Sequence, residues 1–199
     1  MRRTKTLKSV VAVAVLLSCA LWATRASADN GISYHNGFVM AGTSDVYVIW
    51  YGNWTSATGP NSAETQTIVS NFLASFGSSI NAQINFTYGG VNGAPSGGLI
   101  YGGGDVVTYT HGMELDAAAI QAIVSDMLSQ NRLPLDPNGI YLVMASSDVG
   151  STATGFCTPN APPHHGSFIR NSQPVKYAFI GNPARCPSVA APQFFRASA

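Results

Sequence analysis

The side chains of this sequence that could bind a metal ion or carry a proton are its histidines. His111 stands three residues before Glu114, and His164 and His165 are adjacent. Imidazole is a common zinc ligand that titrates near neutral pH. Neither His-Glu-x-x-His nor Cys-x-x-Cys occurs, so no self-contained zinc motif is present. Two interpretations stay open. Either these three histidines bind a ligand or metal, or His111 makes a local hydrogen bond and the other two are exposed residues of a loop.

Motifs for covalent catalysis and for phosphate binding are absent as well. No Gly-x-Ser-x-Gly pattern exposes a serine nucleophile. The glycine-rich stretch 89–104 has no following Lys-Ser or Lys-Thr and no Gly-x-Gly-x-x-Gly that opens a helix. It therefore favours hairpin or loop backbone over a phosphate cradle. The sequence predicts no catalytic residue and no cofactor.

The first 28 residues have the pattern of a secretory signal peptide. Four basic residues among the first eight precede an apolar run, Ser9–Ala23, and three small residues then form a cleavage site. We expect cleavage between Ala28 and Asp29, which leaves a single secreted domain, 29–199. The apolar run is too short to predict a membrane span. A lipoprotein processing site at Cys19 is the alternative, and the apolar residues that continue past it favour ordinary cleavage.

Removal of the signal peptide leaves Cys157 and Cys186 as the only cysteines. In an oxidising compartment two remaining cysteines are expected to pair. A nucleophilic role for Cys157 is the rival interpretation, and export argues against it.

The mature chain is weakly acidic and poor in charge. Five Lys and Arg stand against nine Asp and Glu, which gives a formal charge of −4. Such a domain lacks the excess of basic residues that binding to nucleic acid or to an anionic membrane requires. Asn53 and Asn85 begin Asn-x-Thr sequons, which matter if the host glycosylates secreted proteins.

The strand predicted within Asp45–Trp54 is the element around which the others must pack. Val46–Tyr51 is an unbroken run of β-branched and aromatic residues, typical of a strand buried on both faces. Two amphipathic helices could cover it, one with a capping box at Asn61 and Glu64 and one with Asp116 as its N-cap. Their apolar stripes, expected to face the core, are Ile68, Val69, Phe72, Leu73 and Phe76, and then Ile120, Ile123, Val124, Met127 and Leu128.

Four further strands are predicted. They are Ile80–Tyr88, which alternates as a half-buried strand does, and the apolar segments Val106–Tyr109, Ile140–Ala145 and Val175–Ile180. Strands that alternate with helices indicate a layered α/β fold. The prediction is a single α/β domain in which two amphipathic helices pack on a central mixed β-sheet.

Several short motifs, taken together, resemble the EXORDIUM, or phosphate-induced, family of secreted proteins. In order they are Val46–Trp54, Thr110–Gly112, Asn138–Val143, Ser147–Val149, Phe156-Cys157, Tyr177–Asn182 and Cys186-Pro187. The resemblance implies an extracellular protein, linked in plants to brassinosteroid-dependent growth and cell-wall responses without an established catalytic activity. We expect a monomer, with an unknown extracellular or cell-wall partner.

The chain departs from the family pattern in two ways. Ala161 and Ala190 replace a second pair of family cysteines, and joint loss of one bridge implies that the other, Cys157–Cys186, is kept. His164 matches a family histidine. Family members also continue into a His-Glu-x-x-Glu-like helix reminiscent of zinc-dependent hydrolases, and we expect this chain to lack it. Complete members could therefore hold zinc, which is not expected here.

Three functions fit these observations. The first is a secreted, non-catalytic extracellular or cell-wall-associated factor in growth regulation. The second is a degenerate, zincin-like metal-dependent hydrolase without its metal-binding helix, in which His111 or His164 is a leftover site residue and the fold is the N-terminal part of a zincin. The third is a structural fragment without independent function.

Overall fold

The computed structural model describes residues 39–91, 93–153, 155–158 and 164–190. These residues belong to one compact unit, Asn36–Ala199. The predicted signal peptide, its cleavage site between Ala28 and Asp29, and Ala161 lie outside the described residues.

A five-stranded sheet organises this unit, with the strand order β2-β1-β4-β7-β6. The strands are β1 (Gly42–Tyr51), β2 (Pro95–Val107), β4 (Gly139–Ala145), β6 (His164–Arg170) and β7 (Gln173–Ile180). Neighbours are parallel except that β6 pairs with β7 antiparallel. The expected mixed sheet is therefore confirmed. Two short strands, β3 (Glu114–Leu115) and β5 (Gly150–Ser151), form a separate parallel pair.

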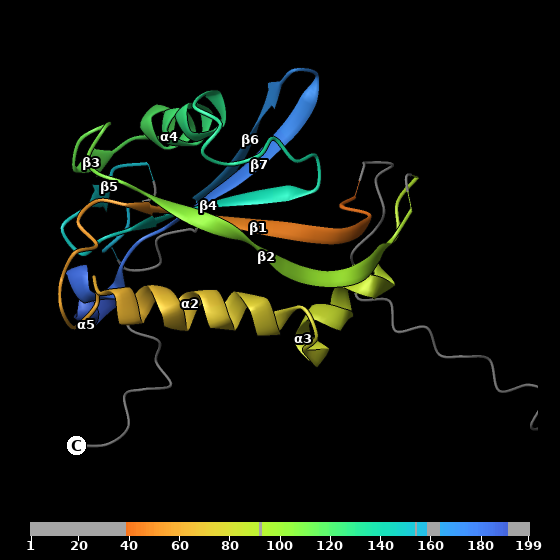
Figure 1. Cartoon of the computed structure of the whole chain (residues 1–199), viewed down its shortest axis with the longest axis horizontal. Coiled ribbons are helices and arrows are strands. Elements are labelled where there is room, and N and C mark those ends of the chain that lie inside the picture. The colour runs from red at the N-terminus through yellow and green to blue at the C-terminus, as the bar shows by residue number, and fades with distance from the viewer. Residues whose placement is uncertain (1–38, 92, 154, 159–163, 191–199) are drawn as a thin grey trace, which may run out of the picture. The chain divides into compact units, whose positions relative to one another are not determined.

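Helices lie on both faces of the sheet, α2 (Ala63–Phe76) on one and α4 (Ala117–Ser129) on the other (Figure 1). Because side chains alternate along a strand, β1 contributes to two separate cores. Val46, Val48 and Trp50 pack on the α2 side, whereas Tyr47, Ile49 and Tyr51 pack on the α4 side. All six side chains are buried, which confirms the prediction of a central strand covered on both faces.

One of the two predicted helix caps is correct. The Asp116 carboxylate accepts a hydrogen bond from Ala119 N at 2.7 Å at the start of α4. The cap of α2 is Ser62 instead of Asn61, because the Ser62 hydroxyl accepts from Thr65 N at 3.3 Å. Ser62 is buried at this helix start, and the Asn61 amide is used for a tertiary contact described below.

The two apolar stripes differ in burial. All five stripe residues of α4 are buried, as predicted. In α2 only Leu73 is buried, whereas Ile68 and Phe72 are 61% and 57% exposed. The expectation that this whole stripe faces the core is wrong, because α2 contacts the sheet along a narrower strip than its apolar sequence suggests.

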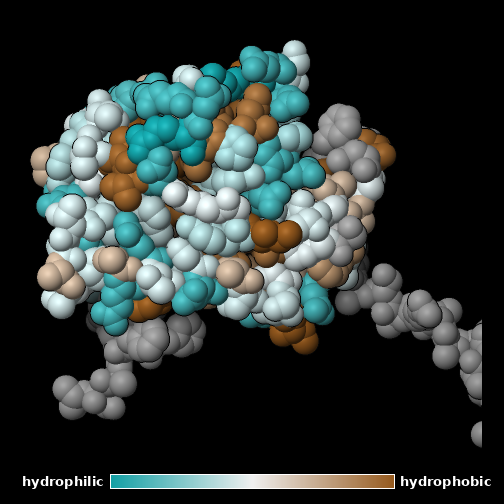
Figure 2. Space-filling model, viewed as in Figure 1, coloured by the Kyte–Doolittle hydropathy of each residue, from teal (hydrophilic) through white to brown (hydrophobic). Residues whose placement is uncertain are grey.

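The strand predicted at Ile80–Tyr88 is also wrong. This segment forms a short α-helix, α3 (Ile80–Gln83), and a 3₁₀ turn, η1 (Ile84–Thr87). The Ser79 hydroxyl accepts from Ala82 N at 3.2 Å and so begins the helix. Ile80 and Ile84 are 78% and 58% exposed, so their alternation did not mark a buried face. Figure 2 shows hydrophobic surface at the lower edge of the view, over α3.

The glycine-rich stretch 89–104 is a loop, as its composition suggested, only before Pro95, where Gly90 N donates to Gly93 O at 2.7 Å. From Pro95 onward it is the edge strand β2, and the loop prediction is wrong there. A Cβ atom on Gly98 would lie 2.3 Å from Gly77 O, at the end of α2, and one on Gly97 would lie 1.7 Å from the Thr43 hydroxyl. Glycine is therefore required because the helix end and β1 approach the strand backbone closely.

The remaining segments lie near the carboxyl end of β7, because His164 and His165 pair with Phe179 and Ala178. His164 and His165, expected in a loop, begin strand β6. Beyond β7 the chain forms a 3₁₀ turn, η2 (Pro183–Arg185), and a single helical turn, α5 (Pro187–Ala190).

Candidate functional site

The order of the strands creates a switch point at the carboxyl ends of β1 and β4. The chain runs from β1 through α2 to β2 on one side of β1, and then through α4 to β4 on its other side. In open α/β sheets, ligands bind outside the carboxyl ends of the strands at such a reversal. Polar residues follow both strands here, Asn53 after β1 and the run Ser146–Asp148 after β4.

Hydrogen bonds join these polar residues into a cluster. Ser146 is fully buried; its hydroxyl donates to Asp148 Oδ1 at 2.5 Å and accepts from Asn53 N at 3.0 Å. Tyr109, which follows β2, donates its hydroxyl to Asp148 Oδ2. A Cβ atom on Gly52 would lie 2.0 Å from Ser146 Oγ, and Gly52 has a φ of +103°, so glycine is needed for this close approach.

The Asp148 carboxyl is held in its charged form. Burial acts to raise its pKa, but hydrogen bonds from Ser146 and Tyr109 and the nearby charge of Arg185 outweigh it, and the pKa is lowered. The hydrogen bond to Asp148, followed by burial, raises the pKa of the Tyr109 hydroxyl. A carboxylate of lowered pKa is a weak general base, and the Ser146 hydroxyl that donates to it is fully buried.

A second set of amide contacts fixes the start of α2 to the ends of β4 and β7. Ser147 N donates to Asn61 Oδ1 at 2.9 Å, and Asn61 Nδ2 donates to Ser147 Oγ at 2.8 Å. Asn182, which follows β7, donates from Nδ2 to the same Asn61 oxygen at 3.0 Å. The sequence analysis did not predict these roles. The signal that could have indicated them is a polar motif directly after an apolar strand, Ser146–Asp148 after β4 and Gly181-Asn182 after β7.

The three candidate histidines have different surroundings, His111 in the turn before β3 and His164 and His165 at the start of β6. His111 Nε2 lies 2.9 Å from Asp126 Oδ2 of α4, and its backbone N donates to the Tyr51 hydroxyl at 2.7 Å. His164 and His165 are consecutive in β6, so their side chains point to opposite faces of the sheet. The His164 Nε2 atom is buried without a hydrogen-bond partner.

These positions do not make a zinc site. Structural zinc requires about four ligands and catalytic zinc about three from the protein. Within the described part of the chain, no group of three His, Cys, Asp or Glu side chains converges on one point. A single buried imidazole nitrogen at His164 does not fit the metal.

Cys157 and Cys186 form a disulfide with their Cα atoms 5.5 Å apart. The bond joins the segment after β5 to the residue after η2. Arg185, the neighbour of Cys186, donates from Nη1 to Asp148 O at 2.9 Å and pairs with Glu114. The disulfide therefore lies next to the contacts that hold the polar cluster.

Both sequon asparagines are exposed. The side-chain oxygen of Asn53 accepts hydrogen bonds from Thr55 N at 3.1 Å and from Thr55 Oγ1 at 2.6 Å. Asn85 Nδ2 donates to Ala82 O at 3.2 Å, and the Asn85 side chain also lines the pocket described next.

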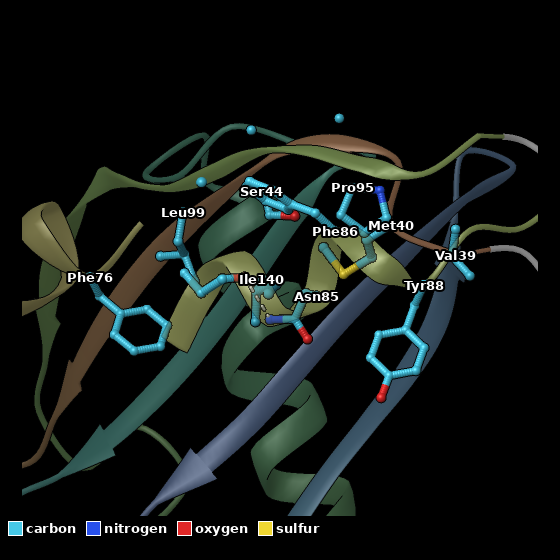
Figure 3. Close-up of a pocket in the computed structure, with 14 residues that line it drawn as sticks. Val39, Met40, Ser44, Phe76, Asn85, Phe86, Tyr88, Pro95, Leu99 and Ile140 are labelled. Atoms are coloured by element: carbon cyan, nitrogen blue, oxygen red, sulfur yellow. Dashed lines mark hydrogen bonds between the residues drawn. The ribbon is translucent and has the colours of Figure 1, made fainter. Parts of the chain in front are cut away.

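A pocket of about 360 Å³ opens at the other end of the sheet, near the amino ends of β1, β2 and β4 (Figure 3). It forms where α2 ends at Phe76 and the short α3 and η1 continue beside the strands. The side chains of Leu99 and Ile140, at one end of the α2-side core, form part of its wall. The pocket is thus an extension of that core which the side chains of the described residues leave unfilled.

The pocket wall is mainly apolar. Its larger apolar side chains are Val39, Met40, Phe76, Phe86, Leu99 and Ile140. Ser44, Asn85 and Tyr88 supply hydrogen-bonding groups. An apolar pocket with a few polar groups is the usual form of a small-molecule site. None of its residues was predicted as a site residue except Asn85, which the sequon had marked for another reason.

A family model described as the phosphate-induced protein 1 conserved region matches residues 32–88 and 103–199. The chain belongs to the phosphate-induced protein 1 family. The resemblance found in its strand-end motifs is therefore confirmed.

One relative in this family is Protein EXORDIUM-like 5 from Arabidopsis thaliana. It is 27% identical over 184 residues, which cover 82% of this chain and 46% of the relative. The chain thus spans about half the length of that protein. No solved structure matches the chain. Among the described helices, none combines the length and apolar content that a membrane crossing requires.

Proposed function

We propose that this phosphate-induced family protein is a secreted, extracellular or cell-wall-associated factor in growth regulation that acts by binding a ligand in the apolar pocket. The single observation that carries this proposal is the pocket itself, a preformed cavity of about 360 Å³ with a mainly apolar wall. Burial of apolar ligand surface would supply affinity at about 25 cal/mol per Å², without movement of the core.

The arrangement of the polar side chains supports binding over catalysis. At the switch point Ser146 donates to an ionised Asp148, and Asn61 is hydrogen-bonded to Ser147 and Asn182. These groups hold the loops after the strands in place. A metal-dependent, zincin-like hydrolase is the rival proposal, and metal analysis separates the two. We expect purified mature protein to hold far less than one zinc ion per chain, and stoichiometric zinc would favour the hydrolase.

Binding of the neutral fluorescent probe N-phenyl-1-naphthylamine tests the pocket. Ala82 is buried on α3 and lines the pocket, whereas Ala74 is exposed on α2 outside it. Ala82→Leu should weaken probe binding at least tenfold because the added side chain occupies the cavity, and Ala74→Leu should leave binding unchanged. Equal binding by both variants and the wild-type protein, with unchanged circular dichroism, would refute the pocket as the site.

A further inference from the structure

We propose that the pocket selects neutral molecules with an apolar body and one hydrogen-bonding head group, of the kind represented by a long-chain alcohol. This inference rests on the proposed function, because it names the ligand class of the same pocket. It depends on the charge and the polar groups of the pocket wall, which are independent of the cellular role.

The described side chains that line the pocket are uncharged. Among the described residues that line it, none carries an ionisable acid or base that is charged at neutral pH. A carboxylate or ammonium group drawn inside the pocket, among its apolar side chains, would lose hydration without gaining a charged partner. Such burial is costly, because an unpaired ion is strongly disfavoured in an apolar environment.

The nearest acid along β1 does not change this. Asp45 directly follows Ser44, but successive strand residues point to opposite faces, so its side chain lies on the α4 side of the sheet. There it faces Asp136, and burial together with this neighbouring carboxyl raises the pKa of Asp45. Neither carboxyl lines the pocket.

A head group that donates and accepts hydrogen bonds would find partners in the pocket. Figure 3 shows the Asn85 amide and the Ser44 hydroxyl among the apolar side chains of the wall. The hydrogen bond from Asn85 Nδ2 to Ala82 O, 3.2 Å long, orients the amide. An amide and a hydroxyl can each pair with a neutral hydroxyl or carbonyl group of a ligand.

Three ligands with the same chain length distinguish binding of neutral molecules from binding of ions. At pH 7.5, 1-decanol, decanoate and decylammonium have the same apolar body and differ in the charge of the head group. Each is titrated against bound N-phenyl-1-naphthylamine, 1-decanol below its solubility limit and the two ions below their critical micelle concentrations. We expect 1-decanol to displace the probe at concentrations at least tenfold lower than either ion. Displacement by decanoate or decylammonium as effective as by 1-decanol would overturn the inference.

A substitution that adds a charge to the pocket wall also tests whether the pocket prefers neutral ligands. Asn85→Asp should reverse the preference, so that decylammonium displaces the probe better than 1-decanol. Asn81→Asp makes the same chemical change at an exposed residue of α3 that does not line the pocket, and it should leave the wild-type order unchanged. An Asn85→Asp protein with the wild-type order of the three ligands would contradict the assignment.

The outcomes distinguish this inference from the proposed function. If the ions bind as well as the alcohol and Ala82→Leu weakens all three, the pocket is a ligand site and the neutral class is wrong. If the probe binds equally to wild-type protein and Ala82→Leu, both proposals fail.

Discussion

Loss of the Cys157–Cys186 bond should destabilise the protein by an amount that depends on the length of the loop that the bond closes. The two cysteines are 29 residues apart in the sequence. In the loop-entropy model, closing a loop of this length removes about 12 cal/mol/K from the unfolded chain, or about 3.6 kcal/mol at 25 °C. For a domain of this size each kcal/mol corresponds to roughly 2–4 °C in Tm. The midpoint should therefore fall by about 7–14 °C.

The assay compares wild-type protein with the double variant Cys157→Ala, Cys186→Ala. Urea unfolding followed by tryptophan fluorescence gives the free energy of unfolding, because Trp50 and Trp54 both lie in the α2-side core. A reducing agent should lower the stability of the wild-type protein and leave that of the double variant unchanged, which serves as the internal control.

Two results would refute this reasoning. A double variant within about 1 kcal/mol of the wild type would mean that the bond does not constrain the unfolded chain as the model requires. Thiol labelling of both cysteines in native, secreted protein would mean that the bond is not formed. A loss well above 4 kcal/mol would point to an added role of the Arg185 contacts with Asp148 and Glu114.

Three further predictions concern packing, pH and export. Gly98→Ala should lower the free energy of unfolding in urea by about 1–3 kcal/mol, because its Cβ would lie 2.3 Å from Gly77 O. The control variant Gly89→Ala should lower it by less than a third as much, because its Cβ would meet nothing closer than 3.7 Å. The raised pKa of Asp45 means that the folded protein binds its proton more tightly than the unfolded chain, so this group's stabilising contribution is present at low pH and is lost as pH rises through the raised pKa. Asp45→Asn should therefore be more stable than wild type at pH 7, with the gain shrinking toward pH of about 4, and thermal melts that show a pH-independent difference would contradict this. Sequencing of the secreted protein should begin at Asp29, and a chain that begins at an acylated Cys19 would show a lipoprotein instead.

The sequence predicted those parts of the fold in which local pattern and tertiary packing agree. Val46–Tyr51 is apolar at every position and is buried on both faces, and the α4 stripe after Asp116 has helical spacing with every member buried. The apolar run of β4 at Ile140–Ala145 is equally direct, since a strand in the middle of a parallel sheet must be apolar on both sides. These segments needed no knowledge of their neighbours.

The secondary-structure predictions were wrong where contacts with another segment determine the local structure. Ile80–Tyr88 alternates like a strand, but Ser79 caps a helix there and the alternating isoleucines face solvent. The glycines of β2 signalled a loop, whereas Gly97 and Gly98 are small because Thr43 and the end of α2 lie against them. Such close approaches are invisible until both partners are placed.

The candidate site shows the same division. The motifs at the strand ends led to the family, and those motifs include Ser147, Asp148 and Asn182, which the structure joins to the loops around them. The apolar pocket could not be predicted, because its wall combines residues from five separate segments that carry no shared pattern. Periodicity indicates which apolar side chains share a face, but it does not reveal that the described side chains leave one end of a core unfilled.

The most direct test of ligand binding in the pocket is the map of backbone amide shifts when isotope-labelled mature protein is titrated with 1-decanol. Binding at the pocket predicts the largest saturable shifts at Asn85, Gly97 and Gly98, with those of Asn53 and Ser147 at the carboxyl ends of the strands unchanged. Saturable shifts confined to Asn53 and Ser147, or no saturable shifts at Asn85, Gly97 and Gly98, would contradict the account.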